Sequence, residues 1–145
     1  MKELIELYRL AEEENIAVDC FELKKREALS VMDEDGACSI AIDPFKLRGE
    51  VDEKMKLAHE LGHCMTGSFY NEFAACDVRE KHEKRAEKWA VEKLVTPEAL
   101  DEAAAEGYIE PWEMAERLDM SENMVREAVC WYRNGNLDLE CACGG

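Results

Sequence analysis

Positive charge is scarce in this 145-residue sequence, which has 18 lysines and arginines against 34 aspartates and glutamates. The resulting formal net charge of −16 repels phosphates, so direct binding to nucleic acid is disfavoured. No stretch approaches the roughly eighteen apolar residues of a membrane span, so we expect no membrane partner. Acidic residues near the N-terminus, where a signal peptide needs a basic end, lead us to expect a cytoplasmic protein.

The seven cysteines are odd in number and lack the paired Cys-x-x-Cys spacing of a zinc knuckle. The odd count and the expected cytoplasmic location both argue against a disulfide scaffold. We therefore expect most of the cysteines to be reduced, small and buried. Cys141 and Cys143 can in principle bind a soft metal, but their place in a Gly-ended tail favours a flexible terminus over residues 134–145.

A chain of this length is expected to form one domain, and its patterns predict an α+β fold that is mostly helical. Apolar periodicity predicts a core over residues 1–95, with a small antiparallel sheet, and a C-terminal helical subdomain over 97–133. The sheet is expected to include a hairpin with Asp35-Gly36 at its turn. The expected elements are helices at 2–14, 49–66, 78–95, 97–106, 110–118 and 121–133, and strands at 16–19, 28–32 and 37–42.

The main chemical motif is His59-Glu60-Leu61-Gly62-His63, which has the HExxH spacing of zinc hydrolases. On a helix the two imidazoles lie one turn apart and can reach one tetrahedral metal, while Glu60 points towards a water beside it. A single histidine beside apolar surface is usually a packed, hydrogen-bonded core residue. Two histidines at this spacing with a glutamate between them favour a pair of metal ligands.

The helix predicted at 78–95 places Glu83 and Glu87 on the same face as Ala86 and Ala90. An unpaired carboxylate on an apolar face is costly, and a metal held by the preceding helix is the available cation. We therefore predict Glu83 as the third ligand and Glu87 as the acceptor that orients a ligating histidine through its free ring N–H. The alternative is that both carboxylates lie on a solvated edge of a charge-rich helix.

Two nearby residues compete for the third-ligand position. Glu80 points from the helix axis in a direction similar to that of Glu83 and is a weaker candidate. His82 would complete a three-histidine site. It points from the helix on the side away from Glu87 and Ala90, however, which favours a surface position or a hydrogen bond to a ligand.

The 59–63 motif and the segment 83–90, Glu-Lys-Arg-Ala-Glu-Lys-Trp-Ala, together resemble the ImmA/IrrE family of zinc-dependent metallopeptidases, particularly the short versions from phages and mobile elements. The resemblance spans about residues 28–137 and includes 67–71 and 132–137. It implies a zincin-like fold and a Zn²⁺ ion. The sequence departs from the family in having Glu87 where aspartate or asparagine is usual, and Pro97 one position later than the common proline. The longer Glu87 side chain leaves open the alternative that Glu87, and not Glu83, is the third ligand.

The resemblance implies peptide-bond hydrolysis, with Zn²⁺ held by His59, His63 and Glu83. Glu60 is expected to take a proton from water and return it to the leaving amine. Tyr70 is a candidate stabiliser of the oxyanion, although an aromatic residue at such a place more often packs a loop. The strand predicted up to Ile42 is expected to provide the edge along which an extended substrate lies.

Relatives of this kind cleave or antagonise helix-turn-helix repressor proteins, so the expected substrate or partner is a DNA-binding repressor of a phage or mobile element. The acidic surface suits a basic protein of that class. One alternative is a non-catalytic, metal-stabilised module that binds the repressor. Another is a direct DNA reader, because residues 115–125 resemble a helix-turn-helix, but residues 98–133 contain ten acidic residues against three arginines and favour packing or protein docking.

Overall fold

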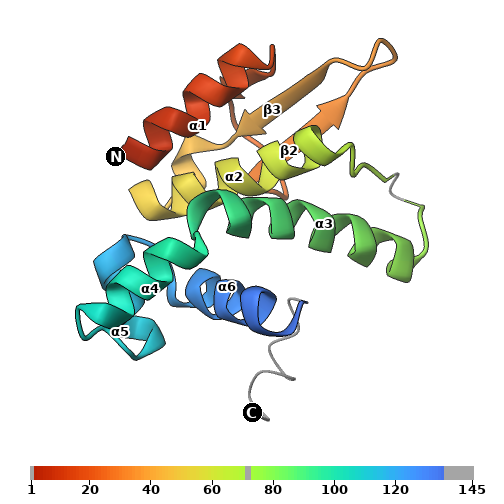
Figure 1. The fold of residues 1–145 in the computed structure, drawn as a ribbon. Helices are drawn as coiled ribbons and strands as arrows, with labels where there is room; N and C mark the ends of the chain where they lie inside the picture. Colours follow the sequence, from red (N-terminus) through yellow and green to blue (C-terminus); the bar gives the residue numbers. More distant parts are fainter. Residues whose placement is uncertain (1, 71–72, 136–145) are drawn as a thin grey trace. The chain divides into compact units, whose positions relative to one another are not determined.

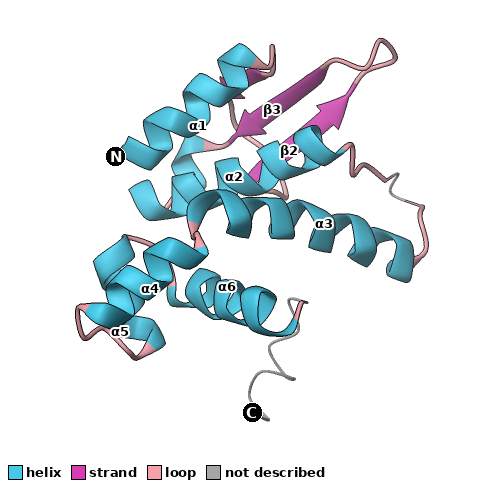
Figure 2. Cartoon of the chain, in the orientation of Figure 1, coloured by secondary structure: helices cyan, strands magenta, loops and turns pink. Residues whose placement is uncertain are grey.

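Six α helices and a three-stranded mixed sheet make up the described part of the chain, residues 2–70 and 73–135, in this computed structural model (Figures 1 and 2). The predicted α+β class is confirmed. The chain divides into two compact units, Met1–Ala90 and Val91–Gly145, which are described separately. None of the helices in the described ranges combines the length and apolar content of a membrane span.

The sheet of the first unit follows α1 (Lys2–Glu13) and consists of β1 (Ala17–Cys20), β2 (Ala28–Met32) and β3 (Cys38–Ile42). β2 and β3 form the predicted hairpin, and Gly36 in its turn has a φ of 86°. β1 pairs with the other side of β3 and runs parallel to it, so the strand order is β1-β3-β2. The prediction of an antiparallel sheet is therefore wrong for β1, because the chain crosses from one side of β3 to the other before the hairpin.

β3 is the central strand. All five of its residues pair with β2, and the four from Ser39 to Ile42 also pair with β1. Its backbone hydrogen bonds are already used within the sheet, so it has no free edge for a substrate strand. The expectation that the strand ending at Ile42 provides that edge is wrong. Within the described residues, β2 has a strand partner on one side only.

Helix α2 (Glu50–Thr66) carries the HExxH motif and lies between the sheet and α3 (Cys76–Leu94) in Figure 1. Its first turn is acidic, which suits the positive end of the helix dipole, and it ends at Gly67 with a φ of 66°. Leu57, Ala58 and Leu61 are fully buried and fix which face of the helix meets the core. The two predicted bounds of this helix are confirmed to within a residue.

Gly62 is the point of closest approach between α2 and α3. A Cβ atom added to Gly62 would lie 2.3 Å from the backbone oxygen of Ala86, which is far inside van der Waals contact. Ala86 and Ala90 are both fully buried, so small residues on α3 face a glycine on α2. This contact sets the distance between the motif histidines and the glutamates of α3.

The segment of residues 21–27 joins β1 to β2 and is held down by Asp43, the buried residue that caps the short 3-10 helix η1 (Pro44–Lys46). The Asp43 carboxylate accepts hydrogen bonds from the backbone N–H of Leu23 and of Phe45, both at 3.0 Å. The Lys46 ammonium donates to the backbone oxygens of Leu23 and Arg26. These contacts fix a loop that would otherwise have no regular backbone pairing.

The second unit contains α4 (Pro97–Ala105), α5 (Pro111–Leu118) and α6 (Glu122–Asn134). The side chains of Thr96 and Ser121 cap α4 and α6 by accepting from backbone N–H groups. The core includes Met124, Val125 and Ala128. The three predicted helices are confirmed. Of the tail predicted to be flexible over 134–145, Asn134 instead ends α6 and Gly135 is its C-cap, while the rest, with Cys141 and Cys143, lies outside the described residues.

The cysteines differ from the expectation that most are reduced and buried. Cys38 and Cys64 form a disulfide with their Cα atoms 5.9 Å apart, Cys20 and Cys76 are exposed, and Cys130 is buried. The disulfide links the start of β3 to the last turn of α2. Sequence spacing did not reveal it because the two residues become neighbours only when α2 packs on the sheet.

We predict that Gly62→Ala destabilises the protein by about 1–3 kcal/mol, because the new methyl group must push the α3 backbone away. Helix propensity alone predicts the opposite sign, since alanine is better than glycine in a helix by about 1 kcal/mol. The free energy of unfolding in urea measures the effect. Met65→Ala, at an exposed position on the same helix, is the control and should cost much less. A Gly62→Ala variant as stable as the wild type would contradict the close approach.

We predict that Asp43 makes the stability depend on pH. The Leu23 N–H bond lowers the pKa of the Asp43 carboxyl below its ordinary 3.8, although burial works against this, and the Phe45 N–H bond adds to the lowering. A lowered pKa stabilises the folded state above about pH 4, and the stabilisation is lost as the pH falls through the folded pKa. Asp43→Asn should therefore cost most at neutral pH and progressively less below pH 4.

Urea unfolding at a series of pH values gives this comparison, with Asp35→Asn in the exposed hairpin turn as the matched control. A difference between wild type and Asp43→Asn that does not change with pH would show that the carboxylate charge is not what holds the segment.

Candidate metal centre

Three potential ligand atoms converge between α2 and α3 within the first unit. The Nε2 atoms of His59 and His63 lie 2.7 and 3.3 Å from Oε2 of Glu83. One ligand atom from each of the three residues lies within 4.8 Å of the others, close enough for a single metal ion. The structure therefore brings together the three residues that the sequence predicts as ligands, whereas their role as ligands remains a prediction.

The second ring nitrogen of each histidine also has a partner. His59 Nδ1 lies 2.8 Å from Oε2 of Glu87, and His63 Nδ1 lies 2.5 Å from the backbone oxygen of Ser68. An Nδ1–H donated to such an acceptor fixes the ring orientation and the tautomer, and it leaves Nε2 to face Glu83. Glu87 thus occupies the position predicted for the orienting acceptor. Ser68 was missed because a backbone oxygen leaves no signal in a sequence.

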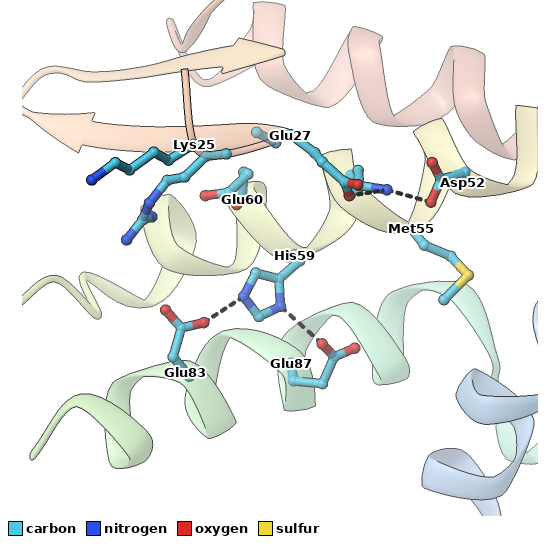
Figure 3. A pocket seen from close by; sticks show the side chains of 11 residues that line it. Lys25, Glu27, Asp52, Met55, His59, Glu60, Glu83 and Glu87 are labelled. Atoms are coloured by element: carbon cyan, nitrogen blue, oxygen red, sulfur yellow. Dashed lines mark hydrogen bonds and ion pairs between the residues drawn. The ribbon is translucent and has the colours of Figure 1, made fainter. Parts of the chain in front are cut away.

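The two α3 glutamates are neither deeply buried nor free in water. Their side chains are 39% and 26% exposed for Glu83 and Glu87, and both contact His59 from opposite sides (Figure 3). The alternative of two carboxylates on a solvated helix edge does not describe them, because each is held by an imidazole. Glu80 does belong to such an edge, where its partner is Lys84 at 3.2 Å.

The histidine and glutamate charges stabilise one another strongly without a metal. Burial lowers the pKa of His59, but the hydrogen bonds to Glu83 and Glu87 outweigh it and raise the pKa to about 10. The pKa of His63 is also raised, because its bonds to Glu83 and to the Ser68 oxygen outweigh burial. The His59 bond, followed by the His63 bond, holds the pKa of Glu83 far below its ordinary value. The acceptors around the two imidazoles therefore favour positive charge on these rings.

The donor set fits a zinc ion. Two imidazole nitrogens and one carboxylate oxygen are the ligands of hydrolytic zinc sites, and each histidine has the outer hydrogen bond that such ligands usually have. A metal ion would take the place of the protons between the histidines and Glu83, so binding would release protons.

Glu60 lies in the same cleft, which has a volume of about 640 Å³ and includes His59, Glu83 and Glu87 in its lining (Figure 3). The residue is 8% exposed, and its Oε1 accepts a hydrogen bond of 2.7 Å from the hydroxyl of Ser30 on β2. This bond fixes the carboxylate from the sheet side. Ser30 was missed by the sequence analysis, although a hydroxyl in the apolar strand Ala28–Met32 was a usable signal.

Tyr70 and His82 lie beside the convergence point but outside it. The Tyr70 hydroxyl donates to Oε1 of Glu83 at 2.6 Å, and this bond, helped by burial, raises the tyrosine pKa. His82 stacks on the Tyr70 ring with centroids 6.1 Å apart, and its buried Nδ1 has no hydrogen-bond partner among the described residues. The structure thus places Tyr70 where it orients Glu83. His82 packs against the Tyr70 ring and is not one of the three converging ligand candidates.

Comparisons of the whole chain with known proteins give no match, either to a protein-family model or to a curated protein. The resemblance to ImmA/IrrE metallopeptidases therefore depends on the motif residues, and its functional content is a proposal.

Proposed function

We propose that this chain is a zinc-dependent metallopeptidase with a zincin-like core, of the ImmA/IrrE kind. The convergence of both HExxH histidines on Glu83, with Glu60 in the same cleft, is the observation that carries the proposal. Structural zinc sites are closed by protein ligands and need no general base beside them, whereas hydrolytic sites combine three ligands with an open position. Glu60 is the feature that distinguishes the two.

Zn²⁺ bound by His59, His63 and Glu83 would supply a Lewis acid that polarises a peptide carbonyl and makes water more acidic. Glu60 then accepts a proton from that water and returns it to the leaving amine. The Ser30 hydroxyl bonds one oxygen of Glu60 and keeps the other available for this transfer. Tyr70 keeps Glu83 in place in the present arrangement, and stabilising the oxyanion requires its hydroxyl to leave Oε1 of that glutamate.

The substrate lies as an extended strand along β2. This strand has a partner on one side only among the described residues. Its Ala28 lines the cleft that contains Glu60, and its Ser30 lines a second cavity beside the motif. Backbone pairing with an edge strand holds a peptide with little dependence on its sequence. The edge therefore presents the scissile bond to Glu60 and the three ligand residues.

The protein substrate is a helix-turn-helix repressor of a phage or mobile element. This part of the proposal is supported by the motif resemblance and by the net charge of −16, which attracts a basic DNA-binding protein. The alternative is that the chain binds and antagonises the repressor without cutting it.

We predict that Glu60→Gln abolishes peptide hydrolysis, with a loss of about 100-fold or more, while zinc binding is retained. Peptide cleavage followed by mass spectrometry and metal analysis of the purified variant measure the two effects. Ser30→Ala should retain part of the activity, because it removes only the bond that orients Glu60. A Glu60→Gln variant that still inactivates the repressor as well as the wild type would favour the non-catalytic alternative.

We predict that the two α3 glutamates differ in their effect on zinc affinity. Glu87→Gln should weaken binding by about 10- to 100-fold, as losses of outer hydrogen bonds to metal ligands commonly do. Glu83→Gln should weaken it more, because it removes a ligand. Competition with a chelating indicator gives both affinities, and Glu80→Gln, at an exposed position of the same helix, is the matched control. The reverse order of the two losses would exchange the roles of Glu83 and Glu87.

A further inference from the structure

Two cations of the segment 21–27 border the proposed catalytic cleft. Lys25 and Arg26 are part of its lining, and in Figure 3 Lys25 and Glu27 lie along one side of it, while Glu83 and Glu87 lie along the other. The segment is held rigidly, because Asp43 and Lys46 bond its backbone. Rigid placement matters, since a charge on a fixed loop costs less ordering entropy when it binds a ligand.

Most other charges that line the cleft are already paired within the protein. Lys56 contacts Asp52 at 2.5 Å and Glu27 at 2.6 Å. Glu83 and Glu87 are held by His59, as described above. Pairing of this kind cancels much of the field that these groups would exert on a ligand.

Lys25 and Arg26 are different, because no carboxylate among the described residues pairs with either of them. Both side chains are exposed. Apart from Glu60, to which the proposed mechanism assigns the proton transfer, the charged side chains of this cleft that lack an oppositely charged partner among the described residues are therefore positive. This is the opposite of the chain as a whole, which has a net charge of −16.

Arg26 also reaches the smaller cavity on the other side of the motif. That cavity, of about 270 Å³, is lined by Arg26 together with His63, Phe69 and Tyr70, among others. The guanidinium lies near enough to Tyr70 to oppose the rise in its pKa. Arg26 can thus meet substrate groups on both sides of the proposed scissile position.

We propose that Lys25 and Arg26 recognise a carboxylate of the substrate next to the bond that is cut. The inference rests on the proposed peptidase function and adds a substrate preference to it. The carboxylate belongs to an aspartate or glutamate side chain or to the C-terminal end of a peptide, because both present the same planar anion to a guanidinium. The preference concerns the segment inside the cleft and is separate from the attraction of a basic protein by the acidic surface.

Three pools of equal-length peptides test this with the zinc-loaded full chain. The first has amidated C-termini and acidic residues at varied positions, the second replaces those residues with lysine, and the third has no acidic side chains but a free C-terminus. Cleavage rates are measured by mass spectrometry, and binding of the same labelled peptides to the Glu60→Gln variant is measured by fluorescence anisotropy. The first or third pool should be preferred over the second by about three- to tenfold, and more strongly at low salt.

Lys25→Gln with Arg26→Gln should remove the preference, and Lys25→Glu with Arg26→Glu should reverse it towards the lysine pool. Both side chains are exposed, so these variants should fold, and zinc content verifies that the centre is intact. Lys24→Gln is the matched control, because Lys24 is an exposed neighbour that does not line the cleft. An Arg26→Lys variant that keeps the preference would support recognition through positive charge more than through the bidentate geometry of arginine.

Preference for the first pool identifies an acidic side chain as the source of the carboxylate, and preference for the third identifies the chain end. Cleavage without a preference, or a preference that the glutamine variants retain, overturns the inference and leaves the peptidase function standing. Acid-selective binding without cleavage of any pool supports carboxylate recognition by Lys25 and Arg26 but contradicts the peptidase function. Equal binding of all pools without cleavage contradicts both.

Discussion

The close contact of α2 with α3 at Gly62 and Ala86 is the constraint on which the rest of the site depends. Only a residue without a side chain allows the two backbones to approach so closely. The approach places His59 and His63 of one helix within hydrogen-bond distance of Glu83 on the other. A wider separation would leave three polar residues facing water instead of one another, so the glycine between the motif histidines is part of the site.

The charges of the site are organised around that contact. Glu83 lies between two imidazoles and takes a further bond from Tyr70, while Glu87 and the Ser68 oxygen hold the outer ring nitrogens. The two carboxylates and the Ser68 oxygen lower the cost of placing positive charge on the imidazoles. The sheet and its preceding loop supply the other groups of the cleft. Ser30 on β2 orients Glu60, and the segment 21–27 before β2 places Lys25 and Arg26 in the lining.

Local patterns were enough to predict the elements and the ligand candidates, because helix caps, glycine stops and the 3.6-residue period are written in adjacent residues. The bounds of α2 and the shared face of Glu83 and Glu87 followed from such signals. Features that depend on long-range packing could not be predicted from such signals. They are the parallel pairing of β1, the central place of β3 and the Cys38–Cys64 disulfide. Each of these joins residues whose proximity is decided only when the sheet and α2 pack together.

X-ray absorption spectroscopy of the zinc-loaded full chain tests the central claim most directly, because it reports which atoms surround the metal. A centre formed by His59, His63 and Glu83 predicts only nitrogen and oxygen neighbours at about 2.0–2.2 Å, with the multiple-scattering signature of imidazole. Sulfur neighbours at about 2.3 Å would show that cysteines hold the zinc and would contradict the account.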